Sequence, residues 1–127
     1  MKKKYKGILI DESVEDSDSI LSEVKIEGQR ITSLEGELFR GDVTFFNIVV
    51  DESNLWNVLE LVAKAIKSPG WYFHLVGNGT LYVVLPGAIL FARKNETEVN
   101  RIIKVAKNQG IHSEQLNLIQ LFDNPYA

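Results

Sequence analysis

The segment Trp71–Phe91, WYFHLVGNGTLYVVLPGAILF, constrains the fold of this chain more than any other. Two apolar runs flank Gly77-Asn78-Gly79, and Pro86-Gly87 separates the second run from a third. Glycine and asparagine tolerate the positive φ angles of tight hairpin turns, so the first turn predicts a pair of antiparallel strands. The second turn predicts that Leu81–Leu85 and Ala88–Ala92 also pair. We therefore expect a three-strand meander.

The elements beside this meander predict one further strong strand and two helices. Val43–Val50 alternates β-branched and aromatic residues, which is typical of a strand. Apolar residues recur at helical spacing over about 53–67, and Ser68-Pro69-Gly70 ends that helix. After the meander, Asn95 and Glu98 have the spacing of a capping box. They begin a second helix, for which Gly110 is the expected C-terminal residue.

The two ends of the chain predict weaker elements. Five of the nine residues from Asp11 to Ser19 are acidic, which favours a loop. The remaining predictions are a strand at Tyr5–Ile10, a half-exposed strand within Ile20–Thr32, a turn at Leu34–Gly41, a helical turn from Ser113 to Leu118, and an end of the ordered chain at Asn124-Pro125.

These elements predict a single α+β domain that spans residues 1–127. A chain of this length can bury a sizeable core without metal or disulfide. The order of strands, helix, three-strand meander and helix predicts a mainly antiparallel sheet of about five strands with two main helices packed on it. A two-layer sandwich of the ferredoxin-like type fits this order. In it, one sheet face takes the helices, and the other faces solvent, a partner or a ligand.

The second sheet face is the candidate ligand or partner face. It comprises four residues: Tyr72, His74, Val76 and Tyr82. His74 is either a partly exposed histidine of this face or a ligand contact and general base. The catalytic alternative requires a pocket that holds His74 beside a carboxylate such as Asp51 or Glu52.

Trp71, Tyr72 and Phe73 are three consecutive aromatic residues that could stack nucleobases. No lysine or arginine lies between Pro69 and Phe91 to neutralise phosphates, and the net charge of the chain is −3. Consecutive strand residues also point to opposite faces. We therefore interpret the aromatic residues as core or interface, and nucleic-acid binding is the weakest alternative.

Several other classes of site are disfavoured. The chain has no cysteine, which excludes disulfides, thiolate nucleophiles and cysteine-based metal centres. The acidic residues from Asp11 to Asp18 lack the glycine and glutamate spacing of a calcium loop. Gly77-Asn78-Gly79 leads into a strand, whereas phosphate-binding loops lead into a helix. We predict no metal and no cofactor.

The N-terminus predicts a cytoplasmic protein without a membrane segment. Basic residues up to Lys6 precede an apolar run, Gly7–Ile10, that is shorter than the roughly 7–15 residues of a signal peptide. The longest apolar run, Leu81–Ala92, is interrupted by Pro-Gly and is shorter than the roughly 20 residues of a membrane helix.

Four segments resemble a family of small uncharacterised bacterial proteins: Gly70-Trp71-Tyr72, Leu81–Leu85, Ile89–Phe91 and Gly110–Leu116. That family shows a Gly-Trp-Tyr strand, an apolar hairpin pair, a helix and a Gly-Ile-Pro-x-x-Gln-Leu ending, whose proline is replaced by His112 here. The resemblance implies a cytosolic α+β domain. It implies no activity and no functional residues.

The function predicted from these patterns is a non-catalytic cytosolic binding or interaction module. It could form a homodimer, or bind a protein partner, through the second face or an edge of its sheet, because both sheet faces carry apolar residues. The alternative is a small ligand-binding protein or enzyme with a pocket near His74 and Tyr72. Single-stranded nucleic-acid binding is a weaker third option.

Overall fold

The computed structural model describes residues 3–33 and 41–127, and these form one antiparallel sheet with helices. The strand order is β2-β3-β1-β4-β5-β6. The strands are β1 (Lys4–Ile10), β2 (Lys25–Ser33), β3 (Asp42–Asp51), β4 (Phe73–Gly77), β5 (Thr80–Leu85) and β6 (Ala88–Arg93). The predicted antiparallel α+β class is confirmed, with six strands rather than about five.

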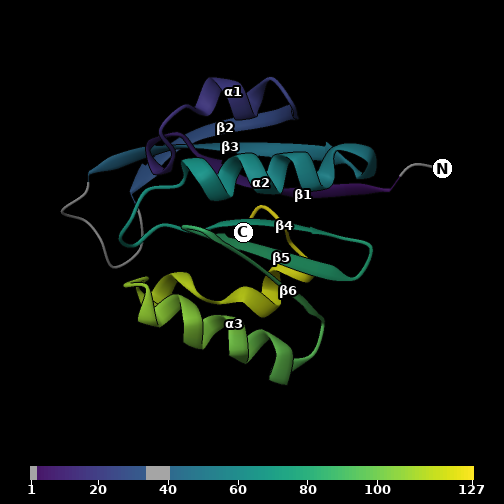
Figure 1. The fold of residues 1–127 in the computed structure, drawn as a ribbon, viewed down its shortest axis with the longest axis vertical. Helices are drawn as coiled ribbons and strands as arrows, with labels where there is room; N and C mark the ends of the chain where they lie inside the picture. Colours follow the sequence, from purple (N-terminus) through teal and green to yellow (C-terminus); the bar gives the residue numbers. More distant parts are fainter. Residues whose placement is uncertain (1–2, 34–40) are drawn as a thin grey trace.

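The described residues also form three α-helices and several short 3-10 segments (Figure 1). The α-helices are α1 (Ser17–Leu21), α2 (Leu55–Ala65) and α3 (Glu96–Asn108). The 3-10 segments are η1 (Asp11–Ser13), η3 (Glu52–Asn54), η4 (Ser113–Gln115) and η5 (Leu118–Phe122). In Figure 1, α2 runs along β1 and β3, whereas α3 lies near β6 beside the yellow C-terminal segment.

The two main helices pack on opposite faces of the sheet, so the two-layer arrangement is wrong. Leu59 of α2 belongs to one buried core together with Val84 of β5. Ile102 of α3 belongs to a second core together with Val83 of the same strand. Neighbouring strand residues point to opposite faces, so β5 is apolar on both sides. Such a strand must be covered on both sides, which produces three layers.

The predicted meander is confirmed in its pairing and its turns. β4 pairs with β5, and β5 pairs with β6, both antiparallel. Asn78 and Gly79 have φ angles of 51° and 75°, as a type I′ hairpin turn requires. The twist of this turn matches the twist of the strands that it joins. Local turn chemistry therefore determined this part of the fold.

The helices begin where the sequence predicts, but the N-terminal third differs. Asn95 Oδ1 accepts a hydrogen bond from the Glu98 backbone N–H at 3.2 Å and caps α3. The acidic segment from Asp11 to Ser19 is only partly a loop, because Asp16 caps α1 and buried Val14 bridges to Ile66. Helix α1 also occupies the start of the strand predicted within 20–32. The predicted turn at 34–41 falls largely outside the described residues.

None of the helices in the described part of the chain combines the length and the hydropathy that a bilayer span requires.

Candidate functional site

The structure divides the four residues of the predicted face between the two sides of the sheet. Tyr72, His74 and Val76 lie on the side of α3 and the C-terminal segment. Tyr82 pairs with Leu75 in the register of β4 and β5, and it packs on the α2 side. Its assignment to the common face is therefore wrong. Alternation within β4 and β5 does not by itself show which residues of the two strands share a face. That also depends on the register between the strands, which the two-residue turn sets.

Tyr72 and His74 are covered by the protein's own C-terminal segment. The Tyr72 hydroxyl donates to the backbone oxygen of Gln115 at 2.6 Å. His74 is 5% exposed, and its Nε2 lies 2.7 Å from the backbone oxygen of Pro125. A carbonyl oxygen can only accept, so Nε2 carries the proton. The predicted second face is thus closed over its centre rather than open to a partner.

Burial controls the ionisation of both residues. It raises the pKa of Tyr72 to about 12 and lowers the pKa of His74 to about 4. The hydrogen bond to Pro125 opposes the second shift but does not cancel it. At neutral pH both side chains are uncharged. His74 therefore serves as a neutral hydrogen-bond donor within the fold.

The carboxylates of the catalytic alternative do not reach His74. In the sheet, Ile8 pairs with His74, whereas Lys4 pairs with Asp51. Four residues of extended strand separate these positions along β1, which corresponds to about 13 Å. Asp51 instead forms an ion pair with Lys4 at 2.8 Å. The predicted dyad is not assembled.

The last residues of the chain form a strap over the sheet, in contrast to the expected end of order at Asn124-Pro125. The Tyr126 hydroxyl lies 2.7 Å from Glu27 Oε1 and 3.2 Å from the Ile48 backbone oxygen. The register of β2 shifts between Ile26 and Gly28, which makes Glu27 the extra residue of a bulge. Burial and the Glu27 carboxylate raise the pKa of Tyr126. No local sequence signal predicts this contact, because its partners lie about a hundred residues apart.

A cavity of about 390 Å³ lies beside the strap, between the sheet and the C-terminal turns. Its lining includes Tyr72 and His74, together with residues of β1, β2 and β3. The expectation of a pocket near these two residues thus agrees with the geometry. The cavity opens over the half of the sheet that α3 does not cover.

The second feature is the edge strand β6, the last strand of the sheet in the described part of the chain. Phe91 is 65% exposed, and its ring centroid lies 6.2 Å from that of Tyr82. Trp56 of α2 is 53% exposed and lies 5.7 Å from Tyr82, edge to face. These three side chains, which we call the aromatic cluster, form an apolar surface at the edge of the sheet.

Alternate residues of β6 point their backbone N–H and C=O groups outward from this edge of the sheet. The two-residue turn makes Leu85 and Ala88 a hydrogen-bonded pair, and such pairs alternate along an antiparallel ladder. The N–H and C=O groups of Ile89, Phe91 and Arg93 therefore point away from β5. Glu98 Oε1 accepts from the Arg93 N–H at 3.1 Å, which agrees with this assignment.

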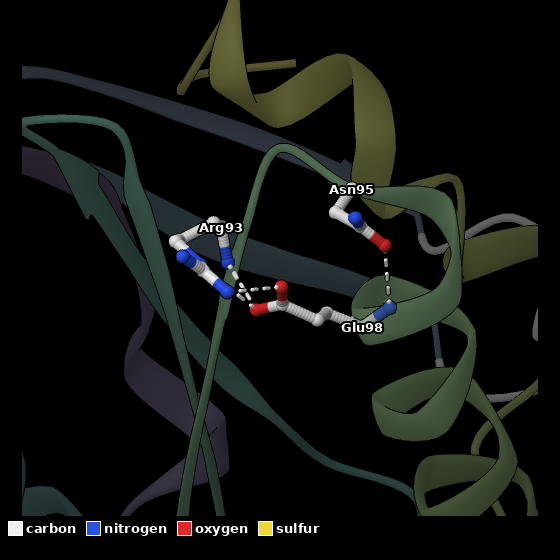
Figure 2. Close-up of polar contacts among 3 residues, drawn as sticks. All are labelled: Arg93, Asn95 and Glu98. Atoms are coloured by element: carbon white, nitrogen blue, oxygen red, sulfur yellow. Dashed lines mark hydrogen bonds and ion pairs between the residues drawn. The ribbon is translucent and has the colours of Figure 1, made fainter.

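Glu98 closes one end of the edge (Figure 2). Its Oε2 forms an ion pair with Arg93 Nη2 at 3.0 Å, while its backbone N–H is held by Asn95. The Arg93 carbonyl in turn accepts from the Asn95 N–H at 2.7 Å. The outward groups of Arg93 are thus satisfied. Ile89 and Phe91 remain as the open part of the edge.

The aromatic residues Trp71, Tyr72 and Phe73 are not a base-stacking platform. Phe73 lies in the α2 core, and Tyr72 packs against the α3 core. Trp71, which precedes β4, belongs to the α2 core and also lines the cavity. The prediction that they are core residues is confirmed. Within the described residues, no three histidine, aspartate or glutamate side chains gather as metal ligands.

Comparison of the chain with protein-family models, curated proteins and solved structures gives no match. The resemblance to the family with the Gly-Trp-Tyr strand stays a prediction.

Proposed function

We propose that this protein is a non-catalytic interaction module that forms a homodimer through its β6 edge. The observation that carries the proposal is the exposed apolar edge itself, where Phe91 adjoins outward-facing backbone groups. Exposed edges with apolar side chains are sites of strand addition. The centre of the second sheet face is covered by the chain, so the edge is the better of the two predicted interfaces.

Antiparallel pairing of two β6 strands would satisfy the open backbone groups. With the twofold axis at Leu90, Ile89 of each copy would lie opposite Phe91 of the other. Each such pair would exchange two hydrogen bonds, because both residues turn their N–H and C=O outward. The edge is therefore complementary to itself, as a twofold interface requires.

The side chains of the same residues support this pairing. Ile89 and Phe91 both lie on the α2 side of the sheet, so each copy would add an aromatic–aliphatic pair across the new strand boundary. Pairing would also extend the aromatic cluster and remove Phe91 from water. Large exposed apolar side chains gain most from such burial.

A non-catalytic role is supported by the state of His74. It is neutral and buried, and its Nε2 is bonded to a backbone oxygen. A general base needs a pKa near the working pH and access to a substrate proton. A cytosolic location belongs to the same proposal.

The test compares the two edges of the sheet by light scattering over a concentration series. Phe91 on β6 and Ile31 on β2 are 65% and 66% exposed, so they form a matched pair for substitution by lysine. We expect the wild type and Ile31→Lys to reach twice the 14.4 kDa chain mass. We expect Phe91→Lys to remain monomeric, because two lysines would approach the interface.

Phe91→Pro gives a second, backbone test. Its N–H faces the open edge, so proline removes an intermolecular donor while the β5 pairing is retained. Loss of the dimer with an unchanged circular dichroism spectrum would support strand pairing. A wild-type protein that stays monomeric throughout, or equal effects of Phe91→Lys and Ile31→Lys, would overturn the proposal.

A further inference from the structure

The cavity beside the C-terminal strap has the size and lining of a small-molecule site, distinct from the β6 edge. Its volume is about 390 Å³, within the range of roughly 300–1,000 Å³ that is usual for ligand pockets. It lies over β1, β2 and β3, whereas the proposed dimer edge is at the opposite end of the sheet. A ligand and a second copy could therefore bind independently.

The floor of this cavity is apolar and aromatic. Ile8 and Ile10 project from β1, Phe45 from β3, and Trp71 from the segment before β4. Trp71 and Ile8 are buried, and Ile10 and Phe45 are partly exposed. A flat apolar or aromatic group would displace water from these surfaces and gain free energy in proportion to the area covered.

One cation stands at the rim of the floor. The centre of the Arg30 guanidinium lies 5.0 Å from the Phe45 ring centroid, so the ring helps to hold it in place. Arg30 Nη2 donates to the Tyr126 backbone oxygen at 3.4 Å, a long hydrogen bond that uses one of five N–H donors. The guanidinium can therefore still present a fork of donors to a carboxylate, sulfonate or phosphate group.

The opposite wall is polar and supplies both donors and acceptors. Asn117 and Gln120 contribute side-chain amides, and Glu114 contributes the acidic group of this wall. His74 lines the cavity as a neutral ring and adds no charge. The lining also includes Ala127, the residue after Tyr126, whose backbone oxygen Arg30 contacts. Arg30 is the basic side chain of the lining and Glu114 its acidic one, so we expect an anionic group at Arg30 and an uncharged, hydrogen-bonding edge toward Glu114.

We propose that the cavity binds a small aromatic anion. The ring system would lie on the floor between Phe45 and Trp71, and its anionic group would bind Arg30. The ring system would contact the apolar floor and the anionic group would contact the guanidinium. The two contacts together would hold the ligand in one orientation. The β2 bulge contributes indirectly, because Glu27 and Ile48 hold Tyr126, whose backbone oxygen positions Arg30.

The test uses 8-anilinonaphthalene-1-sulfonate as the probe, since it combines aromatic rings with one anionic group. The chain has two tryptophans, so Trp56→Phe leaves Trp71 as the single reporter on the cavity floor. Phe91→Lys in the same background removes the exposed aromatic cluster as a competing site. We expect saturable, one-to-one quenching of Trp71 with a rise in probe emission.

Arg30→Gln in this background is expected to weaken probe binding about tenfold, as loss of a charged hydrogen bond predicts. Arg30→Lys should retain part of the affinity. Arg93→Gln, which removes an exposed arginine at the other edge of the sheet, is the matched control and should leave the affinity for the probe unchanged. The uncharged analogue N-phenyl-1-naphthylamine should bind equally well with and without Arg30.

Two results would overturn the proposal. One is an unchanged Trp71 emission while the probe still binds, which would place the probe elsewhere. The other is an equal loss of affinity in Arg30→Gln and Arg93→Gln, which would indicate a general charge effect. The dimer does not involve Arg30, so light scattering of Arg30→Gln separates failure of this site from failure of the β6 interface.

Discussion

The two faces of the sheet are covered in different ways. On one face, α2 packs four buried apolar side chains into a core to which α1 adds Ile20. On the other face, α3 covers the β5–β6 end, and the C-terminal turns and strap cover the centre. This second cover consists of several separate segments rather than one helix. It includes buried His74 and leaves a cavity over β1, β2 and β3.

The difference shows where stability and function can be separated. A continuous amphipathic helix buries its apolar stripe with its backbone groups already bonded. A cover made of 3-10 turns and a terminal strap depends on specific polar contacts, each worth little alone. We therefore expect the α2 face to dominate stability and the C-terminal face to respond to pH and to ligands.

The largest effect should come from truncating the core beneath α2. Leu59 on α2 and Leu118 in η5 are both fully buried, one on each face. Leu→Ala in such sites costs about 2–5 kcal/mol of unfolding free energy, depending on how far the cavity collapses. We expect Leu59→Ala near the upper end and Leu118→Ala near the lower end, because the turn that carries Leu118 can relax inward.

Urea denaturation of both variants measures these costs. Equal losses of unfolding free energy in the two variants would contradict the expected difference between the two faces, since the two covers would then be equally rigid.

The next effect is the pH dependence that His74 gives to the C-terminal face. Its pKa is about 4 in the folded protein against an ordinary value of 6.5, so the unfolded chain binds the proton more readily. Stability is therefore complete above about pH 7 and falls as the pH decreases toward 4. Between pH 7 and pH 5 the expected loss is about 2 kcal/mol.

His74→Gln keeps a donor for the Pro125 oxygen but does not titrate. Its unfolding free energy should change less over this pH interval than that of the wild type. Identical pH profiles for the two proteins would show that His74 is not buried as a neutral group.

A smaller effect is expected from the strap. Tyr126→Phe removes the hydroxyl that lies between Glu27 and Ile48, and it should cost about 1 kcal/mol. Hydrogen exchange provides the sharper measurement. Amide protons at the C-terminus should exchange faster in the variant, while those of α2 should stay protected. Faster exchange in α2 as well would mean that the two covers unfold together.

The smallest effect concerns the start of α3. Asn95→Ala removes the exposed side-chain cap of this helix and should lower the unfolding free energy by about 0.5 kcal/mol. Asn95→Asp retains an acceptor oxygen at the same position and serves as the control. The control should be close to wild type in thermal denaturation. Equal losses in both variants would assign the effect to the loop rather than to the cap.

Local patterns predicted most of the elements. Asn78-Gly79 determines a hairpin wherever it joins two apolar strands, and Asn95 caps a helix through its own next turn. The acidic segment after Asp11 was less predictable, because Val14 becomes buried only through a bridge to Ile66. Tyr82 was assigned to the wrong face, since alternation within one strand does not give its register with the next.

The candidate site was predictable in part. Alternation placed Tyr72 and His74 on one face, and the structure adds a cavity beside them. Arg30 and the Tyr126 strap could not be inferred, because they approach from strands and turns that are distant in the sequence.

The sequence by itself determined most of the segments of this protein that form strands and helices, because those choices depend on side chains within a few residues of one another. It also required, through the two-sided apolar pattern of β5, that both faces of the sheet be covered. The tertiary structure alone decided how: α3 crosses to the face opposite α2, and the C-terminal strap closes over His74. Those choices depend on contacts between residues far apart in the chain, and these form only when the sheet has assembled.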